Sequence, residues 1–166
     1  MSLRSSLLEK VDRAYELVKA LSARANVPEV PVYEVDANFV IGAIARKLPR
    51  PEHISILDGR YRTTTIDGFR EIVIWDSVNL RRYILDFWDC DNYAFRFKSN
   101  VESVFMINAV GYVIDLSVPE CAHAYNIFVD NVGDVYVYEP QTDAIMTVDE
   151  ARRDCKYRME HFWVAI

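Results

Sequence analysis

Three short segments of the sequence contain residue types that together could ionise a thiol and hold it ready for reaction. Their key residues are Cys90 in segment 89–94, His123 in segment 122–126 and Glu139 in segment 138–142. An imidazole can take the proton of a thiol, and a carboxylate can orient the imidazole while it does so. The three segments lie close enough along the chain for one compact core to bring them together.

The segment around Cys90 predicts a helix that begins at this cysteine, with Asp89 as its N-cap. A cysteine in the first turn lies near free backbone N–H groups, which favour a thiolate and could also stabilise an oxyanion. Trp88 stands beside this position and is a candidate for lining a ligand pocket. The alternative is that Cys90 is simply buried among aromatic neighbours, as many free cysteines are.

His123 and Glu139 are predicted to meet through a pair of antiparallel strands. The pattern favours strands at 124–130 and 135–138, joined by a turn at 131–134. Counting inward from the turn places Glu139 near Asn126, within reach of His123. The alternatives are a hydrogen-bonded core histidine and an exposed glutamate at a strand end.

Composition narrows the class of protein. The chain has 166 residues, 51% of them hydrophobic, which predicts a single folded domain over residues 1–166. With a net charge of −6 and no basic stretch, nucleic acid is not an expected partner. The sequence shows neither a signal peptide nor a long apolar run, so we expect a cytoplasmic protein without a membrane partner. Three cysteines without a CxxC pair argue against disulfides and structural zinc.

The pattern of apolar residues predicts an α+β fold. Helices are expected at 2–25, 37–47 (capped by Asp36), 76–86, 89–101 and 148–155, and strands at 30–35, 54–57, 61–66, 70–75, 104–116, 124–130, 135–138 and 161–166. The strands that follow residue 104 alternate as a meandering antiparallel sheet does.

The three segments resemble the core of the papain-like, transglutaminase-like cysteine hydrolase superfamily over residues 88–142. The combination of Asp-Cys-Asp with Glu-Pro-Gln is most similar to the C-terminal protease domains of a fungal galactose-specific agglutinin and its phage and bacterial relatives. This resemblance implies a helix bearing the nucleophile, packed on an antiparallel sheet, with N-terminal helices added. It also implies a cysteine peptidase or amidase that acts on a peptide or protein substrate.

Two features depart from the resemblance or extend it. Most transglutaminase-like proteins have aspartate where this chain has Glu139, and the β-trefoil that usually precedes the agglutinin branch is not seen, so lectin activity is not carried over. The branch implies calcium, for which Asp89 and Asp91 could supply oxygen ligands. Acidic residues at a helix start also simply suit the helix dipole. No cofactor is required, and Gln141 is a candidate oxyanion donor.

Other functions remain open at this stage. Transfer of the acyl group to an amine, or deamidation of glutamine, would use the same three residues as hydrolysis. A non-catalytic binding or scaffold module with an idle triad is the alternative from another class. The sequence predicts neither the substrate nor the oligomeric state.

Overall fold

The computed structural model describes residues 26–166 together with Ala14 and Val18. The helix predicted at 2–25 therefore lies outside the described residues, apart from these two positions. Within the described part, no helix is both long enough and apolar enough to cross a membrane.

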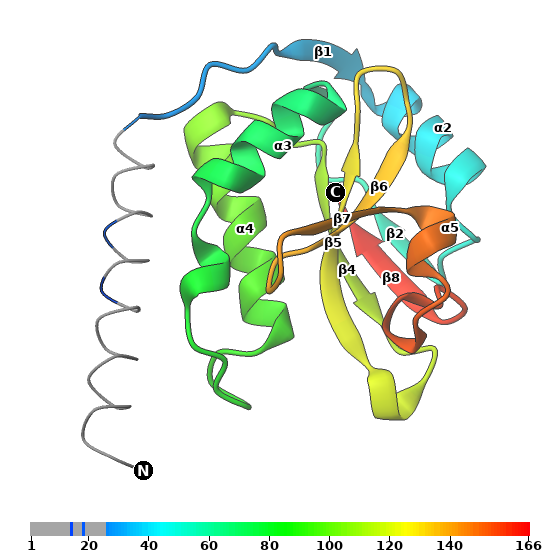
Figure 1. Cartoon of the computed structure of the whole chain (residues 1–166). Coiled ribbons are helices and arrows are strands. Elements are labelled where there is room, and N and C mark those ends of the chain that lie inside the picture. Colours follow the sequence, from blue (N-terminus) through cyan, green and yellow to red (C-terminus); the bar gives the residue numbers. More distant parts are fainter. Residues whose placement is uncertain (1–13, 15–17, 19–25) are drawn as a thin grey trace.

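A six-stranded sheet forms the centre of the molecule, in the order β2-β8-β4-β5-β6-β7 (Figure 1). Its strands are β2 (His53–Ser55), β4 (Val110–Asp115), β5 (His123–Val129), β6 (Val135–Glu139), β7 (Ala144–Thr147) and β8 (Phe162–Ala165). Strands β2 and β8 run parallel, and the other neighbours are antiparallel. The prediction of a purely antiparallel sheet is therefore wrong at this edge.

A separate two-stranded antiparallel sheet joins β1 (Tyr33–Asp36) to β3 (Arg60–Thr63). The strands predicted at 54–57 and 61–66 are separated by Asp58-Gly59, a sequence typical of a hairpin turn. Instead, β2 and β3 belong to different sheets, and the segment between them carries the chain from one sheet to the other.

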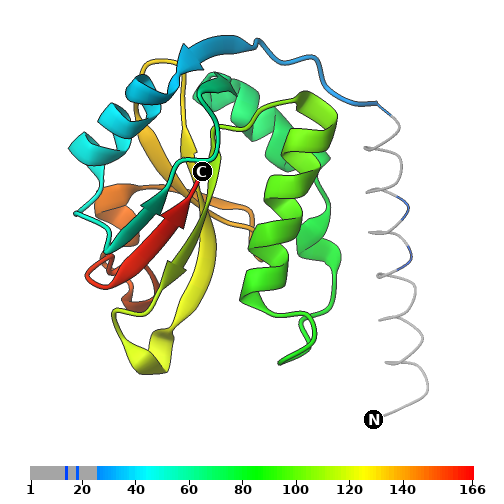
Figure 2. The ribbon, with the colours of Figure 1, turned by 180° about the vertical axis from the view of Figure 1, so that it is seen from behind.

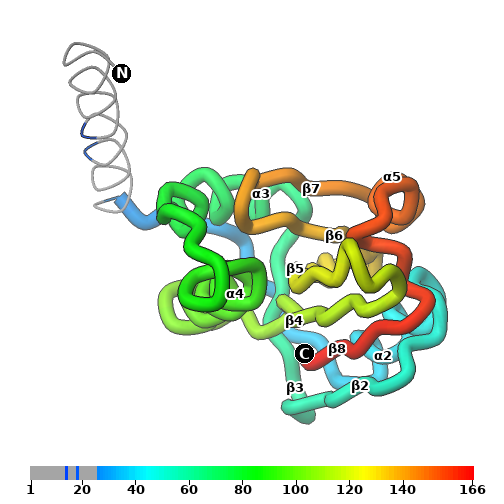
Figure 3. Tube along the Cα trace, turned by 90° about the horizontal axis from the view of Figure 1, so that it is seen from below, coloured from blue at the N-terminus to red at the C-terminus, as the bar shows by residue number. Residues whose placement is uncertain are grey.

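Helices cover both faces of the large sheet, as the views from behind and from below show (Figures 2 and 3). On one face lie α3 (Ile66–Trp75) and α4 (Cys90–Phe105), and on the other α2 (Ala37–Lys47) and α5 (Val148–Ala151). Two buried clusters match these layers. One contains Val40, Ile44 and Ala151, and the other contains Phe69 and Phe97.

Two helices begin where the sequence predicts. The carboxylate of Asp36 accepts a hydrogen bond from the Phe39 N–H at 2.9 Å, which caps α2. At the start of α4, the side chain of Asn92 accepts from the Asp89 N–H at 3.1 Å. The start of α4 fixes the position of Cys90.

The region between residues 61 and 86 differs from the prediction. The strand expected at 70–75 is the helix α3, because Thr65 caps its start and its buried side, with Phe69 and Ile72, follows helical spacing. The helix expected at 76–86 is only a short 3₁₀ turn, η1 (Val78–Leu80), followed by irregular chain. Here the carboxylate of Asp76 accepts from the Val78 N–H and from Asn100, and these bonds hold the chain away from α3.

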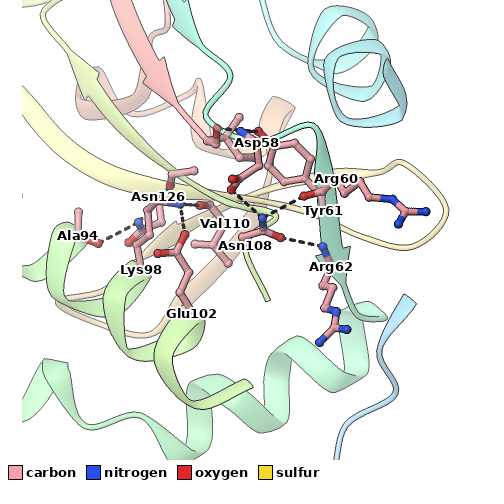
Figure 4. A network of polar contacts seen from close by, with 12 residues as sticks. Asp58, Arg60, Tyr61, Arg62, Ala94, Lys98, Glu102, Asn108, Val110 and Asn126 are labelled. Carbon is pink, nitrogen blue, oxygen red and sulfur yellow. Dashed lines mark hydrogen bonds and ion pairs between the residues drawn. The ribbon is translucent and has the colours of Figure 1, made fainter. Parts of the chain in front are cut away.

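Polar side chains fix α4 and the 58–62 segment to the sheet (Figure 4). The buried amide of Asn126 on β5 donates to the Ala94 carbonyl of α4 at 3.0 Å and to the Gly111 carbonyl of β4 at 3.1 Å. The amide of Asn108 joins the carboxylate of Asp58 and the backbone of β3. Asn126 therefore ties the helix that begins with Cys90 to the strand that begins with His123.

Candidate functional site

The candidate site lies where α4 begins and β5 begins. Cys90 is the first residue of α4 and is half-buried, and His123 is the first residue of β5 and is buried. The side chain of His123 and the backbone of Ala124 lie close enough to the Cys90 thiol to lower its pKa. The structure thus joins the thiol and the imidazole that the sequence singles out.

Glu139, the last residue of β6, lies on the other side of the His123 ring. The Nε2 atom of His123 donates to the Oε2 atom of Glu139 at 2.5 Å, which leaves Nδ1 for Cys90. In the β5–β6 ladder Asn126 is opposite Tyr138, so Glu139 falls one step further along and one residue nearer His123 than the count from the turn predicts. Cys90, His123 and Glu139 therefore form one continuous hydrogen-bonded array.

Two more groups hold the carboxylate of Glu139. The hydroxyl of Tyr157 donates to Oε2 at 2.7 Å, and the backbone N–H of Gln141 donates to Oε1 at 3.0 Å. Tyr157 was not singled out from the sequence, because it lies in a short 3₁₀ segment without a motif of its own. Gln141 takes part through its backbone, and the oxyanion role expected of its side chain stays a prediction.

The surroundings shift the pKa values of all three groups. Burial raises the pKa of the Cys90 thiol, but the hydrogen bonds from His123 and the Ala124 backbone outweigh it and bring the pKa below its usual value. Burial lowers the pKa of His123, whereas its hydrogen bonds to Cys90 and Glu139 raise it, and the result is a pKa of about 9. Burial raises the pKa of Glu139, and the bond from His123 contributes most to the net lowering.

These shifts move Cys90 toward the thiolate form, and they favour an imidazolium on His123 and a carboxylate on Glu139 at neutral pH. A thiolate is a good nucleophile and a strong hydrogen-bond acceptor, and an imidazolium is a fixed cationic donor.

The acidic residues beside Cys90 interact with each other. The interaction between the two carboxyls lowers the pKa of Asp89 and raises that of Asp91. Among the residues that the structure describes, no group of three or more His, Cys, Asp or Glu side chains is arranged to hold a metal ion. Calcium at Asp89 and Asp91 therefore stays a prediction without geometric support.

A groove with a volume of about 490 Å³ lies beside the first turns of α4, and its lining includes Trp88 and Asp91, which stand on either side of Cys90 in the sequence. Three aromatic side chains line it together with polar and charged ones: Trp88, Phe95, Tyr112, Arg81, Arg96, Asp91, Asn92 and Ser99. The rings of Phe95 and Tyr112 meet edge to face at 5.7 Å, and the Arg81 guanidinium lies 4.6 Å from the centre of the Trp88 ring. Trp88 thus lines a pocket near the start of α4, and its part in holding a ligand stays a prediction.

The other two cysteines are joined. Cys121 and Cys155 form a disulfide, with a Cα–Cα distance of 5.8 Å, and Cys90 is the one free cysteine in the described residues. The prediction of three free thiols is wrong, because the odd count conceals one pair and one free residue. Three free thiols would have favoured a reducing compartment, and the disulfide removes that argument. The cytoplasmic location stays a prediction.

Comparisons with known proteins point to lectins. A family model described as "Ricin-type beta-trefoil lectin C-terminal domain" matches residues 46–156. The fold is similar to a structure described as a PSL1a-E64 complex, with a TM-score of 0.64 and 20% identity over 80% of this chain and 51% of that one. A Polyporus squamosus lectin bound to Neu5Aca2-6Galb1-4GlcNAc gives a TM-score of 0.62 and 20% identity over 80% of this chain and 49% of the lectin.

The chain thus spans about half the length of the solved structures it matches, and at this identity the likeness concerns the fold. No curated protein matches the sequence.

These findings correct the assignment made from the sequence. The family that matches is one of lectin domains and not the papain-like, transglutaminase-like cysteine hydrolase superfamily. The predictions of a hydrolase, a thiol protease or a cysteine peptidase with a catalytic triad are therefore wrong as well. A lectin neighbour binds a saccharide, whereas a peptide substrate was expected. The match covers two thirds of the sequence. The chain belongs to the family of ricin-type beta-trefoil lectin C-terminal domains.

Proposed function

We propose that this chain is a non-catalytic binding module of the lectin type and that it binds a saccharide in the groove beside Cys90. The observation that carries the proposal is the family match over residues 46–156. A saccharide bound to the Polyporus squamosus lectin, whose fold is similar, supports the ligand class.

The groove has the chemistry that a saccharide requires. A sugar ring has apolar C–H faces that pack on aromatic rings and hydroxyl groups that need donors and acceptors. The rings of Trp88 and Tyr112 supply the first, and the side chains of Asp91 and Asn92 supply the second. Arg96 adds a guanidinium that could bind an acidic sugar through its carboxylate.

In this proposal the hydrogen-bonded array is the charged end of the binding site. The thiolate of Cys90 accepts from ligand hydroxyl groups, and the imidazolium of His123 fixes the thiolate in its charged form. The array is preorganised because three donors hold Glu139 in place, so little side-chain freedom is lost when a ligand binds.

The test is calorimetric titration of the full chain with a panel of oligosaccharides that includes Neu5Aca2-6Galb1-4GlcNAc. Tyr112→Ala should weaken binding at least about tenfold, a loss of about 1.4 kcal/mol. Trp163→Ala is the matched control, because Trp163 is an exposed aromatic on β8 outside the groove, and it should leave the affinity unchanged.

Two outcomes would overturn the proposal. One is that no oligosaccharide of the panel binds to the folded protein. The other is turnover of a peptide or amide substrate by the wild-type chain that disappears in Cys90→Ala, since a non-catalytic module has no turnover to lose.

A further inference from the structure

The disulfide connects the two segments that reach Glu139 from its buried side. Cys121 ends the 3₁₀ turn η2 (Pro119–Cys121), two residues before His123. Cys155 begins the 3₁₀ turn η3 (Cys155–Tyr157), two residues before Tyr157. One covalent bond therefore fixes the spacing between the segment that carries the imidazole and the segment that carries the phenol.

Tyr157 contacts both members of the His123–Glu139 pair. Its hydroxyl donates to the same Oε2 atom of Glu139 that accepts from His123. Its ring meets the His123 ring edge to face, with centroids 5.6 Å apart, and the Tyr125 ring at 5.0 Å. The side chain of Tyr157 is buried and packs against both His123 and Glu139.

The segment around Tyr157 is held by contacts on both sides of its turn: the Met159 N–H donates to Asp115 at 2.8 Å, and the Arg152 side chain donates to the Arg158 carbonyl at 3.1 Å. Its turn is only three residues long, and such a short 3₁₀ turn has little stability of its own. The neighbouring side chains of Lys156 and Arg158 are exposed. The bond from Cys155 to Cys121 is the covalent contact among those that hold η3 near the site, and the buried ring of Tyr157 adds to it.

We propose that Tyr157 is a positioning residue for the His123–Glu139 pair, and that the Cys121–Cys155 disulfide is a redox-sensitive lock that keeps Tyr157 in place. A dithiol opens the lock by thiol–disulfide exchange. The S–S bond breaks and takes up two electrons and two protons to give two thiols, while the dithiol is oxidised to a cyclic disulfide. Both cysteines are half-buried at the surface, within reach of such a reductant.

Reduction of the disulfide should first weaken the contact between Tyr157 and Glu139 and then the position of His123 beside Cys90. Without the cross-link, η3 can move away, and the carboxylate of Glu139 loses one of its three donors. The His123 ring is then held less firmly beside Cys90, and the thiolate loses part of its stabilisation. The inference does not rest on the proposed ligand, because the reactivity of Cys90 itself reports it.

The test follows alkylation of Cys90 by iodoacetamide from pH 5 to 9 in the full chain, quantified on the Cys90 peptide by mass spectrometry. In Tyr157→Phe the midpoint should move up by about half a pH unit to one unit, because the pair is less well held. The same shift should follow in the Cys121→Ser/Cys155→Ser double variant, and in wild-type protein that has been reduced with dithiothreitol and desalted.

The control is Tyr136→Phe, which removes a phenol from the same strand as Glu139 and should leave the midpoint unchanged. The other groups facing Cys90, namely Asp89, Asp91 and Tyr112, are the same in every variant, so they contribute equally throughout. An unchanged midpoint in either Tyr157→Phe or the disulfide-free protein, with only a lower melting temperature, would show a purely structural role and overturn the proposal.

Discussion

The carboxylate of Glu139 is surrounded by donors from three different segments of the chain. His123 reaches it from β5, Tyr157 from η3 and Gln141 from the residues that follow β6. Charged groups are rarely buried unless they are paired and hydrogen-bonded, because desolvation costs several kcal/mol. The completeness of these bonds explains how the pair His123–Glu139 can remain charged where both side chains are almost wholly buried.

The thiol contributes to the charge on His123. Cys90→Ala should lower the pKa of His123 from about 9 by about one unit, because the imidazolium loses one of its two anionic partners. The pKa should stay above 6.5, since Glu139 remains. NMR titration of the imidazole C–H signals measures the shift. A pKa that remains near 9 in the variant would contradict the pairing of Cys90 with His123.

The same pair predicts how stability depends on pH. The folded pKa of His123 is raised, so its contribution is complete below the unfolded value of 6.5 and is lost as the pH rises through about 9. The pKa of Glu139 is lowered, so its contribution is complete above 4.5 and is lost as the pH falls below that value.

Glu139→Gln should therefore lower the free energy of unfolding most between pH 5 and 6.5, by about 2 kcal/mol, and progressively less toward pH 10. Urea unfolding of both proteins across this range measures the difference. A difference that does not change with pH would indicate that the effect comes from packing and not from charge. The variant Glu160→Gln, on an exposed residue, is the control and should follow the wild-type profile.

At the scale of elements, the site depends on how α4 is fixed to the sheet. Asn126 donates to one carbonyl of α4 and one of β4, both in the buried interior. Asn126→Ala should lower the free energy of unfolding by about 1–3 kcal/mol, because both bonds are lost and a cavity remains. It should also slow alkylation of Cys90, whose helix is then less well placed.

Chemical denaturation and iodoacetamide labelling together check this prediction. Asn131→Ala, in the turn between β5 and β6, is the matched control and should change neither result. Loss of stability without any change at Cys90 would show that α4 does not need Asn126 to hold its position.

The sequence predicted those elements whose ends carry a local signal. Asp36 and Asp89 mark helix starts, and the turn at 131–134 sets the register that brings Glu139 toward His123. The helix α3 was mistaken for a strand, because its run of Ile72, Val73 and Ile74 has high strand propensity. Burial of its Phe69 side against α4 and the sheet overrides that propensity.

Contacts between segments far apart in the chain are not marked by any local pattern in the sequence. Tyr157 lies 18 residues after Glu139 and meets it only because the chain returns after β7, and the two bonded cysteines, Cys121 and Cys155, are 34 residues apart. Neither pairing follows from spacing, since residue types so far apart in the sequence are joined only by the tertiary fold. The function could not be read from the array either, because the residue types of the array occur in proteins of more than one function.

At the scale of the whole molecule, the disulfide closes a large loop that contains β5, β6, β7 and α5. The two cysteines are 34 residues apart, and linking them restricts the unfolded chain. Reduction should therefore lower the free energy of unfolding by about 2–4 kcal/mol, as found for loops of this size. Urea unfolding of oxidised and reduced protein, followed by circular dichroism, measures the loss.

In Cys90→Ala the same loss is expected, because the free thiol takes no part in the bond. Equal unfolding midpoints with and without reductant would mean that the fold gains nothing from the cross-link, and a loss confined to the protein with Cys90 intact would point to exchange between the free thiol and the disulfide.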